Sequence, residues 1–126
     1  MLMVKTRIAP SRIAGIGVFA DQDIPAGTVT WRFMPGYDLL LTQRAIDALP
    51  QPARSSLLDL GYYHAATNCY VLCADNARFM NHADEPNTAR VHVDGAIEDD
   101  DIATRDIRVG EEMTCDYRLF DADEFW

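Results

Sequence analysis

The sequence predicts one β-rich α+β domain that covers residues 1–126. Three observations lead to this fold class. Apolar residues alternate in many short runs bounded by Gly, Pro and Asp, which is typical of strands joined by turns. Helical apolar spacing is confined to the middle of the chain. The length suffices for one hydrophobic core but not for two, so short strands with interposed helices indicate a single α+β domain.

The N-terminal part is expected to contain two strands. Val4 to Ile8 alternates like a strand, and Val18 to Ala20 is a second apolar stretch. The segment between them, Pro10 to Gly17, holds Pro, Ser and two glycines, and this punctuation predicts a loop.

A turn and a further strand follow. In Asp23 to Thr28, Pro25 presets φ and Gly27 accepts a positive φ, which predicts a turn. Val29 to Phe33 reads as the next strand, and we expect it to pair antiparallel with the strand before the turn. The same Asp-Ile-x-x-Gly punctuation recurs at Asp106 to Glu111. We interpret it as convergent turn chemistry and not as a repeat.

Two short helices are predicted in the middle of the chain. Thr42 can cap a helix from Gln43 to Leu49. Pro52 suits the first position of a second helix, which runs to Leu60 and stops at Gly61. Their apolar spacing is compatible with packing on a sheet.

The C-terminal half returns to strands. Tyr70 to Cys73 reads as a buried strand, and Ala89 to Val93 alternates as another. Asp94 to Asp101 holds five acidic residues and is expected to be a solvated loop. Ile102 to Ile107 and Glu112 to Tyr117 are expected to complete the sheet.

The charge balance limits the classes of partner that the protein is expected to bind. A net charge of −9 argues against direct nucleic-acid binding, which needs clustered Lys and Arg. The acidic surface either steers a basic partner or only keeps the protein soluble. No apolar run approaches the ~20 residues of a membrane span, and residues 1–12 lack the pattern of a secretory signal. We therefore expect an intracellular protein, cytoplasmic or, if the Arg-over-Lys bias reflects a prokaryotic source, nucleoid-associated.

The cysteines do not predict a disulfide framework or a metal site. Cys69, Cys73 and Cys115 are an odd number without a secretory signal, so free thiols are expected. Cys69 and Cys73 with His64 lack the matching second pair of ligands that zinc sites usually have. We predict no metal.

Two polar segments stand out because they follow neither a helical nor a strand period. In the first, Arg78 to Asn87, the apolar pair Phe79-Met80 leads directly into the amide of Asn81 and the imidazole of His82. This sequence suits the floor of a ligand site. Asn87, after Pro86, can close a local turn through its own side chain. The second segment is Gly110 to Tyr117.

These segments resemble the RFINHSxxPN and GEELTxDY signatures of the SET-domain protein-lysine methyltransferases, and Gly15 to Ala20 resembles the family's GxGVFA segment. The order and spacing match over nearly the whole chain. The resemblance implies the SET-domain fold, a β-clip-like set of several short sheets with a threaded C-terminal segment that brings both signatures together. It also implies S-adenosylmethionine as methyl donor and a lysine in a basic protein or peptide as acceptor.

The resemblance assigns residues to the cofactor. Asn81 matches the side chain that binds the amino-acid end, and His82 matches the residue whose backbone meets the adenine. The full set implied for cofactor contact is Gly15, Ile16, Gly17, Tyr70, Asn81, His82, Tyr117 and Trp126. Tyr62 and Tyr63 compete with Tyr70 for its role. Trp126, with Phe125, either folds over the adenine or serves an interface.

Tyr117 matches the family's catalytic tyrosine, and Cys115, Tyr70 and Phe120 are expected to line the lysine channel. The reaction needs a neutral amine, and an apolar channel beside a sulfonium cation lowers the pKa of lysine, so no strong base is required. The family often has Phe or Tyr at position 115. The smaller Cys115 predicts di- or trimethylation, unless Tyr70 or Phe120 fills the space.

Some residues depart from the family pattern. Asp75 and Arg118 replace glycines, and no cysteine follows Cys115, so the zinc-binding extension is missing. Arg78, Phe79 and Glu112 are interpreted as scaffold residues.

The missing extension makes a homodimer possible, with a second subunit completing the channel. It also leaves open the alternative of a SET-like module that binds the cofactor or a peptide without turnover. An unrelated hydrolase that uses His64, His82 or His92 has no nucleophile motif to support it.

Overall fold

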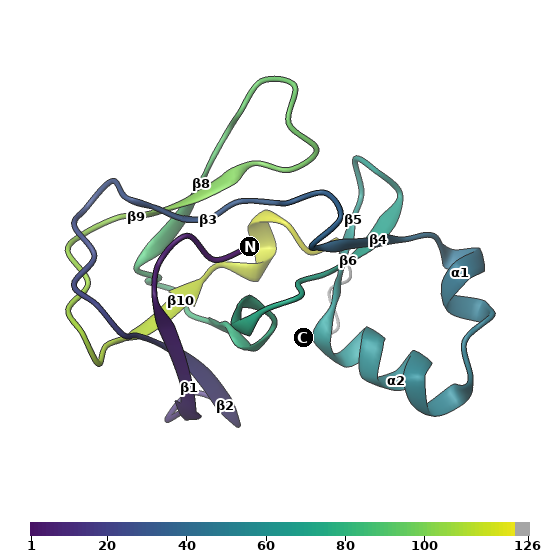
Figure 1. Cartoon of the computed structure of the whole chain (residues 1–126), viewed down its shortest axis with the longest axis horizontal. Coiled ribbons are helices and arrows are strands. Elements are labelled where there is room, and N and C mark those ends of the chain that lie inside the picture. The colour runs from purple at the N-terminus through teal and green to yellow at the C-terminus, as the bar shows by residue number, and fades with distance from the viewer. Residues whose placement is uncertain (123–126) are drawn as a thin grey trace.

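The computed structural model describes residues 1–122 and contains three small sheets, two short α-helices and two 3-10 helices (Figure 1). The strands are β1 (Thr6–Pro10), β2 (Ile16–Ala20), β3 (Val29–Trp31), β4 (Leu39–Leu41), β5 (Tyr62–His64), β6 (Cys69–Leu72), β7 (Asn81–His82), β8 (Thr88–Val91), β9 (Asp100–Ala103) and β10 (Glu112–Cys115). The helices are α1 (Gln43–Asp47), α2 (Gln51–Leu60), η1 (Asn76–Phe79) and η2 (Tyr117–Leu119). This strand-rich architecture confirms the predicted β-rich α+β class.

The strands form three sheets whose neighbours are mostly distant in sequence. Their orders are β1-β2-β10-β7, β3-β9-β8 and β4-β6-β5. Helices α1 and α2 lie at one end of the molecule beside the β4-β6-β5 sheet, and the turns between β2 and β3 and between β9 and β10 lie at the opposite end (Figure 1). The β1–β2 hairpin projects from the lower edge of this view. The motif segments on β7 and β10 lie in the four-stranded sheet between these ends.

The predicted pairing across the Asp23 turn is wrong. Strand β2 pairs with β1 and β10, whereas β3 pairs with β9 in another sheet. The turn instead docks against the second Asp-Ile turn, and the backbones of Ile24 and Ile107 exchange two hydrogen bonds of 2.8 Å. Both isoleucines are about 1% exposed. Burial of these two side chains against each other therefore separates the flanking strands.

The docking of the two turns is reciprocal. Asp23 accepts a hydrogen bond from the Val109 N–H at 3.0 Å, and Asp106 accepts one from the Ala26 N–H at 2.8 Å. Gly27 and Gly110, both at positive φ, donate to the carbonyls of Ala103 and Ala20, respectively, each at 2.8 Å. Each carboxylate thus satisfies a backbone donor of the opposite turn, which would otherwise remain unpaired.

The core forms two groups of buried side chains. The larger one underlies the four-stranded sheet and the docked turns, and contains Val18, Ala20, Ile24, Met80, Ala103, Ile107, Met113 and Cys115. The smaller one joins the other two sheets through Trp31, Phe33, Val71 and Cys73. The larger group anchors the strands that carry the motifs, through Met113 and Cys115 on β10 and Met80 directly before β7.

The helices follow their sequence signals closely. The Thr42 hydroxyl accepts a hydrogen bond from the Ala45 N–H at 3.2 Å, which confirms the predicted cap. Helix α1 ends at Asp47, earlier than predicted, because a residue before Pro50 is disfavoured in helical conformation. Gly61 ends α2, and a Cβ there would lie 2.8 Å from the Val71 carbonyl oxygen. Only glycine permits this approach of β6 to the helix end.

The acidic segment Asp94–Asp101 is only partly a solvated loop, contrary to expectation. The Glu98 side chain is fully buried, and Asp100 and Asp101 begin β9, which ends at Ala103. Pairing of β9 with both β3 and β8 brings these carboxylates inward.

The remaining strand boundaries differ modestly from the predictions. Strand β1 starts two residues later than predicted and includes Pro10, which an edge strand tolerates. Strand β10 ends at Cys115, and Tyr117 opens the short helix η2.

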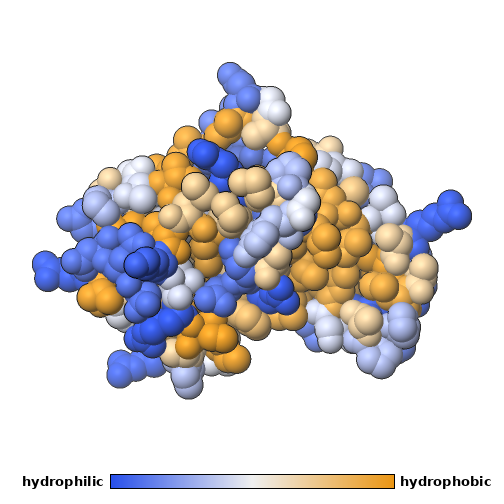
Figure 2. Space-filling model, viewed as in Figure 1, coloured by the Kyte–Doolittle hydropathy of each residue, from blue (hydrophilic) through white to orange (hydrophobic). Residues whose placement is uncertain are grey.

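The surface shows an apolar area between β4 and α2 (Figure 2), where Leu39 and Leu58 are 47% and 45% exposed. Within residues 1–122, no helix has the length and apolar character needed to cross a membrane.

Candidate active site

The two motif segments lie side by side. Strands β7 and β10 pair in parallel, with Asn81 opposite Thr114 and His82 opposite Cys115. This is the juxtaposition that the resemblance implied. Asn87 reinforces it, since its side chain donates to the Glu112 carbonyl at 2.8 Å and accepts from the Thr114 N–H at 2.9 Å. Asn87 thus fastens the first motif to β10 and does not act through the local turn expected from the sequence.

Asn81 belongs to a hydrogen-bond network, here called the Asn81 network, with Glu112 and Ser11. Its amide nitrogen lies 3.0 Å from the Ala14 carbonyl oxygen, 3.2 Å from that of Ile16 and 2.9 Å from Glu112 Oε1. Three acceptors around one atom identify that atom as the NH₂ group. In the described part of the chain no hydrogen bond uses Asn81 Oδ1, which is left as an acceptor for another group.

Glu112 is the centre of this network. Its carboxylate also accepts hydrogen bonds from the Ser11 hydroxyl at 2.9 and 3.0 Å. A Cβ at position 17 would lie 2.2 Å from Glu112 Oε1, so the carboxylate fills the space that a side chain would need. Glu112 is thus a scaffold residue, as predicted, and Gly17 provides the room for it. Gly15, with φ +45°, forms the turn that precedes β2.

His82 contacts the start of η2. Its Nδ1 accepts a hydrogen bond from the Tyr117 N–H at 3.2 Å, and the two rings lie 5.4 Å apart between centroids. A ring nitrogen that accepts carries no proton, so neutral His82 is protonated on Nε2. Nε2 lies 3.6 Å from an Asp84 carboxylate oxygen. The ring therefore couples the end of the first motif to the predicted catalytic tyrosine.

The Tyr117 side chain turns towards the core side of β7. Its hydroxyl donates to the Met80 carbonyl oxygen at 2.5 Å. Burial, followed by the nearby Cys115, raises the pKa of Tyr117 to about 12. The phenol thus stays neutral at physiological pH, and its proton is directed at the Met80 carbonyl oxygen.

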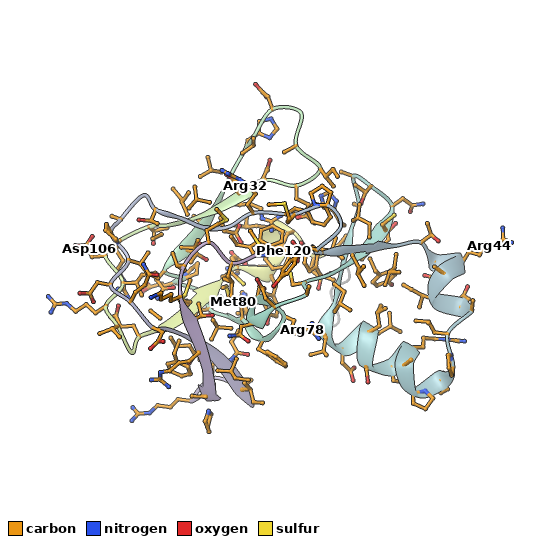
Figure 3. The ribbon with its side chains drawn as sticks, in the orientation of Figure 1. Arg32, Arg44, Arg78, Met80, Asp106 and Phe120 are labelled. Atoms are coloured by element: carbon orange, nitrogen blue, oxygen red, sulfur yellow. The ribbon has the colours of Figure 1, made fainter. Side chains whose placement is uncertain are left out.

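A cavity of about 660 Å³ lies where the three sheets meet, and its volume is within the usual range for ligand sites. All the residues predicted for the catalytic step and the channel line it, namely Tyr70, Cys115, Tyr117 and Phe120. Figure 3 shows Phe120 and a further lining residue, Met80, in the middle of the molecule. The predicted channel residues are therefore brought together.

The other residues predicted for the cofactor lie beside the cavity. Among residues 1–122, the lining does not include Gly15, Ile16, Gly17, Asn81 or His82, which gather on the β2-β10-β7 side. Tyr62 lines the cavity together with Tyr70, whereas Tyr63 packs its ring 5.2 Å from that of Tyr70. Tyr70 and Tyr62 both remain possible for the cofactor role. Trp126 and Phe125 lie outside the described residues.

Aromatic rings and a charge cluster form the wall opposite Tyr117. The Phe120 ring lies 5.8 Å from that of Tyr117 and 4.8 Å from that of Tyr62. Behind it, Arg90 forms ion pairs with Glu98 and Asp101, the acidic residues that the sequence placed in a solvated loop. Arg90 was the sequence signal that could have predicted the burial of these acidic residues, because an arginine buried within a strand needs a counter-ion.

Buried thiols line the same cavity. Burial is the main cause that raises the pKa of Cys115 above its ordinary value and that of Cys73 to about 12. Both are therefore neutral thiols with little nucleophilic character. Within residues 1–122 no group of His, Cys, Asp and Glu side chains is arranged to hold a metal, and the absence of a metal stays a prediction.

Comparison with known proteins agrees with this geometry. The SET-domain family model matches residues 15–118. The crystal structure of a candidate histone methyltransferase from Plasmodium falciparum aligns with a TM-score of 0.59 and 20% identity, covering 99% of each chain, and this likeness shows the fold. No curated protein matches the sequence. Because the family model spans most of the chain, the protein belongs to the SET-domain family, the protein-lysine methyltransferase family that its motifs predict.

Proposed function

We propose that this protein transfers methyl groups from S-adenosylmethionine to the side-chain amine of lysine in a basic protein or peptide. The observation that carries the proposal is the parallel pairing of β7 with β10, beside a cavity that Tyr117 lines with other aromatic rings. Membership of the SET-domain family supports the same reaction class.

The residues on the β2-β10-β7 side have chemistry that fits the cofactor. Asn81 Oδ1 is an acceptor, which suits the ammonium of the amino-acid end, and its orientation is set by the three acceptors around Nδ2. The backbone of Gly15 to Gly17 and of His82 would complete the site. When bound, the cofactor supplies an electrophilic methyl group on a sulfonium.

The chain's own part is to hold a neutral amine in line with that methyl group. Lysine has a pKa of ~10.4 in water, and an apolar environment lowers it because burial disfavours the charged form. The rings of Tyr62, Tyr117 and Phe120 would exclude water around the amine. Tyr117 is a poor general base with its raised pKa, so we assign its hydroxyl oxygen the role of positioning the amine.

The substrate is proposed to be basic and the location intracellular. A net charge of −9 favours the approach of a Lys- or Arg-rich segment through long-range attraction. Assembly as a homodimer, in which a second subunit completes the channel, belongs to the same proposal.

The number of methyl groups is proposed to exceed one. Cys115 is smaller than Phe or Tyr, and it lines the cavity, so a methylated amine has room to rotate and realign. Phe120 and Tyr70 share the cavity and could fill that room instead. Mass spectrometry of a peptide whose methylation has been driven to completion decides whether this room is open or filled. We expect di- or trimethyl-lysine from the wild type and more monomethyl-lysine from Cys115→Tyr, whereas a wild type that adds only one methyl group contradicts the argument from size.

The main experiment separates an enzyme from a binding module. The protein is first titrated with S-adenosylmethionine by calorimetry and then incubated with methyl-labelled cofactor and a lysine-rich protein mixture. Binding followed by label on a substrate band supports the proposal. Binding without transfer to any protein favours the alternative of a SET-like module without turnover. Absence of cofactor binding rejects the enzyme and leaves only a SET-like module that binds a peptide.

A further inference from the structure

Arg90, Glu98 and Asp101 form a group of buried charges, here called the Arg90 cluster, of which Arg90 and Asp101 line the cavity. The Arg90 guanidinium lies 2.7 Å from Glu98 Oε2 and 3.1 Å from Asp101 Oδ1. The side chains of Arg90, Glu98 and Asp101 are 12%, 0% and 12% exposed, respectively. The Tyr62 hydroxyl donates to the second Glu98 oxygen at 2.7 Å, so both oxygens of this carboxylate are occupied.

Such a cluster fixes its arginine firmly. Removing one member of a buried ion pair leaves an uncompensated charge, which is strongly destabilising. Here two carboxylates share one guanidinium, which donates to each of them from a separate nitrogen. Arginine stays protonated even when it is buried, so its charge always needs these two carboxylates. The two contacts also hold its planar group at a defined angle. Arg90 is therefore a rigid part of the wall.

The face of this guanidinium supports the channel. Its Cζ lies 4.7 Å from the ring centroid of Phe120 and 5.7 Å from that of Trp31, distances typical of cation–π contacts. Trp31 and Arg90 both lie opposite Asp101, on the two neighbouring strands of β9. The sheet thus presents the guanidinium to Phe120 from behind.

Phe120 links Arg90 to the candidate catalytic residue, Tyr117, because its ring contacts both. Its ring contacts that of Tyr117 on one side and that of Tyr62 on another, and Tyr62 is itself bonded to the Arg90 cluster. Phe120 follows η2 and has no strand of its own to fix it. Packing against Arg90, Tyr62 and Tyr117 thus sets the position of its ring.

We propose that Arg90 is a positioning and specificity-determining residue: held by Glu98 and Asp101, it fixes the Phe120 ring against Tyr117 and so sets the width of the lysine channel. This inference rests on the proposed methyl transfer. It adds a residue outside the motifs and predicts that the number of methyl groups depends on the charge cluster as well as on Cys115.

The test replaces Arg90 with Lys, which keeps the positive charge but loses the planar face and the two-nitrogen contact. The readout is the ratio of the second to the first methylation rate on one peptide, because the amount of folded enzyme cancels in this ratio. We expect Arg90→Lys to raise the ratio about threefold or more, since a looser Phe120 ring admits a larger amine. An unchanged or lower ratio overturns the proposal.

Arg32 offers a matched control. It follows β3 directly and forms a two-nitrogen ion pair with Asp100 of β9, at 2.9 and 2.6 Å, outside the cavity lining. Arg32→Lys should leave the ratio within about 1.5-fold of wild type, in keeping with the small effect of a partly exposed pair. An equal rise in both variants would mean that the sheet in general, and not Arg90, sets the ratio, and would overturn the proposal.

A double-mutant cycle tests the path through Phe120. Phe120→Leu should raise the ratio as Arg90→Lys does, and the combined variant should add nothing further, because both remove one support. Additive effects would show that Arg90 does not act through Phe120.

A second measurement does not depend on turnover. In aromatic NMR spectra, Arg90→Lys should shift the ring signals of Phe120 and Tyr117, and Arg32→Lys should not. Unchanged Phe120 signals overturn the inference even in an active enzyme. Shifted signals in a protein that transfers no methyl group would support the positioning role and reject only the proposed function.

Discussion

The two sides of the candidate site are held by different forces. On the β2-β10-β7 side, the Asn81 network fixes the backbone through directed hydrogen bonds among Ser11, Asn81 and Glu112. On the other side, the cavity wall depends on burial, with aromatic rings packed against the Arg90 cluster. A substitution in a hydrogen-bond network removes individual bonds, and its cost depends on their geometry. A substitution in a packed wall changes stability through the volume and charge of the buried side chain. The two sides should therefore fail differently when they are altered.

The largest effect is expected at the junction of the two sides. Tyr117→Phe removes the hydroxyl that bonds Met80 but keeps the ring that packs on Phe120. We expect methyl transfer to fall about a hundredfold or more while cofactor affinity changes little, because only positioning at the amine is lost. Single-turnover kinetics and calorimetry measure the two quantities. Activity within a few-fold of wild type would remove Tyr117 from the catalytic role.

The Asn81 network is tested by affinity. Asn81→Ala should weaken cofactor binding by roughly 1 to 3 kcal/mol, the usual effect of leaving buried polar groups without a partner. Ser11→Ala is the control, because it removes another partner of Glu112 and leaves the Asn81 amide in place. Calorimetry that finds equal affinities for wild type and Asn81→Ala would contradict the assignment of Asn81 to the cofactor.

The geometry of the same network is tested by stability. Gly17→Ala places a Cβ where the Glu112 carboxylate lies, and the carboxylate can move only by giving up its bonds to Ser11 and Asn81. We expect the free energy of unfolding in urea to fall by about 1 to 3 kcal/mol. In a Glu112→Ala background the same substitution should be nearly neutral. If Gly17→Ala lowers the free energy of unfolding by the same amount in that background, the added Cβ clashes with a group other than the Glu112 carboxylate.

The cavity side should respond to alkaline pH. Burial raises the pKa of Cys73 to about 12, whereas an exposed thiol in the unfolded chain has a pKa of ~8.5. Because the folded pKa is the higher one, the contribution of this thiol to the free energy of unfolding is constant below about pH 8 and decreases as the pH rises towards 12. Between pH 8 and 9.5 we expect a loss of about 1 kcal/mol per buried thiol. Cys73→Ala should reduce this pH dependence in urea titrations, and an unchanged slope would show that Cys73 is not the source.

Much of the candidate site could be predicted because its residues lie in two contiguous motifs. Asn81 and His82 lie on β7, Cys115 ends β10 and Tyr117 opens the helix directly after it, so the pairing of β7 with β10 was enough to bring them together. The roles of individual residues stay predictions, and what the structure adds is their neighbours.

The rest depended on strand pairings and side-chain contacts that no local sequence signal specifies. The turn chemistry of Asp23 to Thr28 is the same whether the flanking strands pair with each other or the turn docks elsewhere, so local signals could not decide the pairing. Glu98 reads as a solvated acid because the acidic run around it contains no basic residue, and only the pairing of β8 with β9 brings it back to Arg90, eight positions earlier. Glu112 could be recognised as scaffold, but not as the reason for glycine at position 17.

The reciprocal docking of the two Asp-Ile turns also bears on how the chain folds. The hydrogen bonds of Asp106 and Asp23 to the opposite turn join residues 80 and 86 positions apart. The chain must close loops of this length, at a cost in conformational entropy, before the two turns can form their stabilising contacts. Folding is therefore expected to be slow relative to helical proteins of similar size. A chain growing from its N-terminus makes the first turn early but lacks its partner until residue 111 has been added. The strands β2 and β10 can meet only then, so the candidate site is assembled in the last steps of folding.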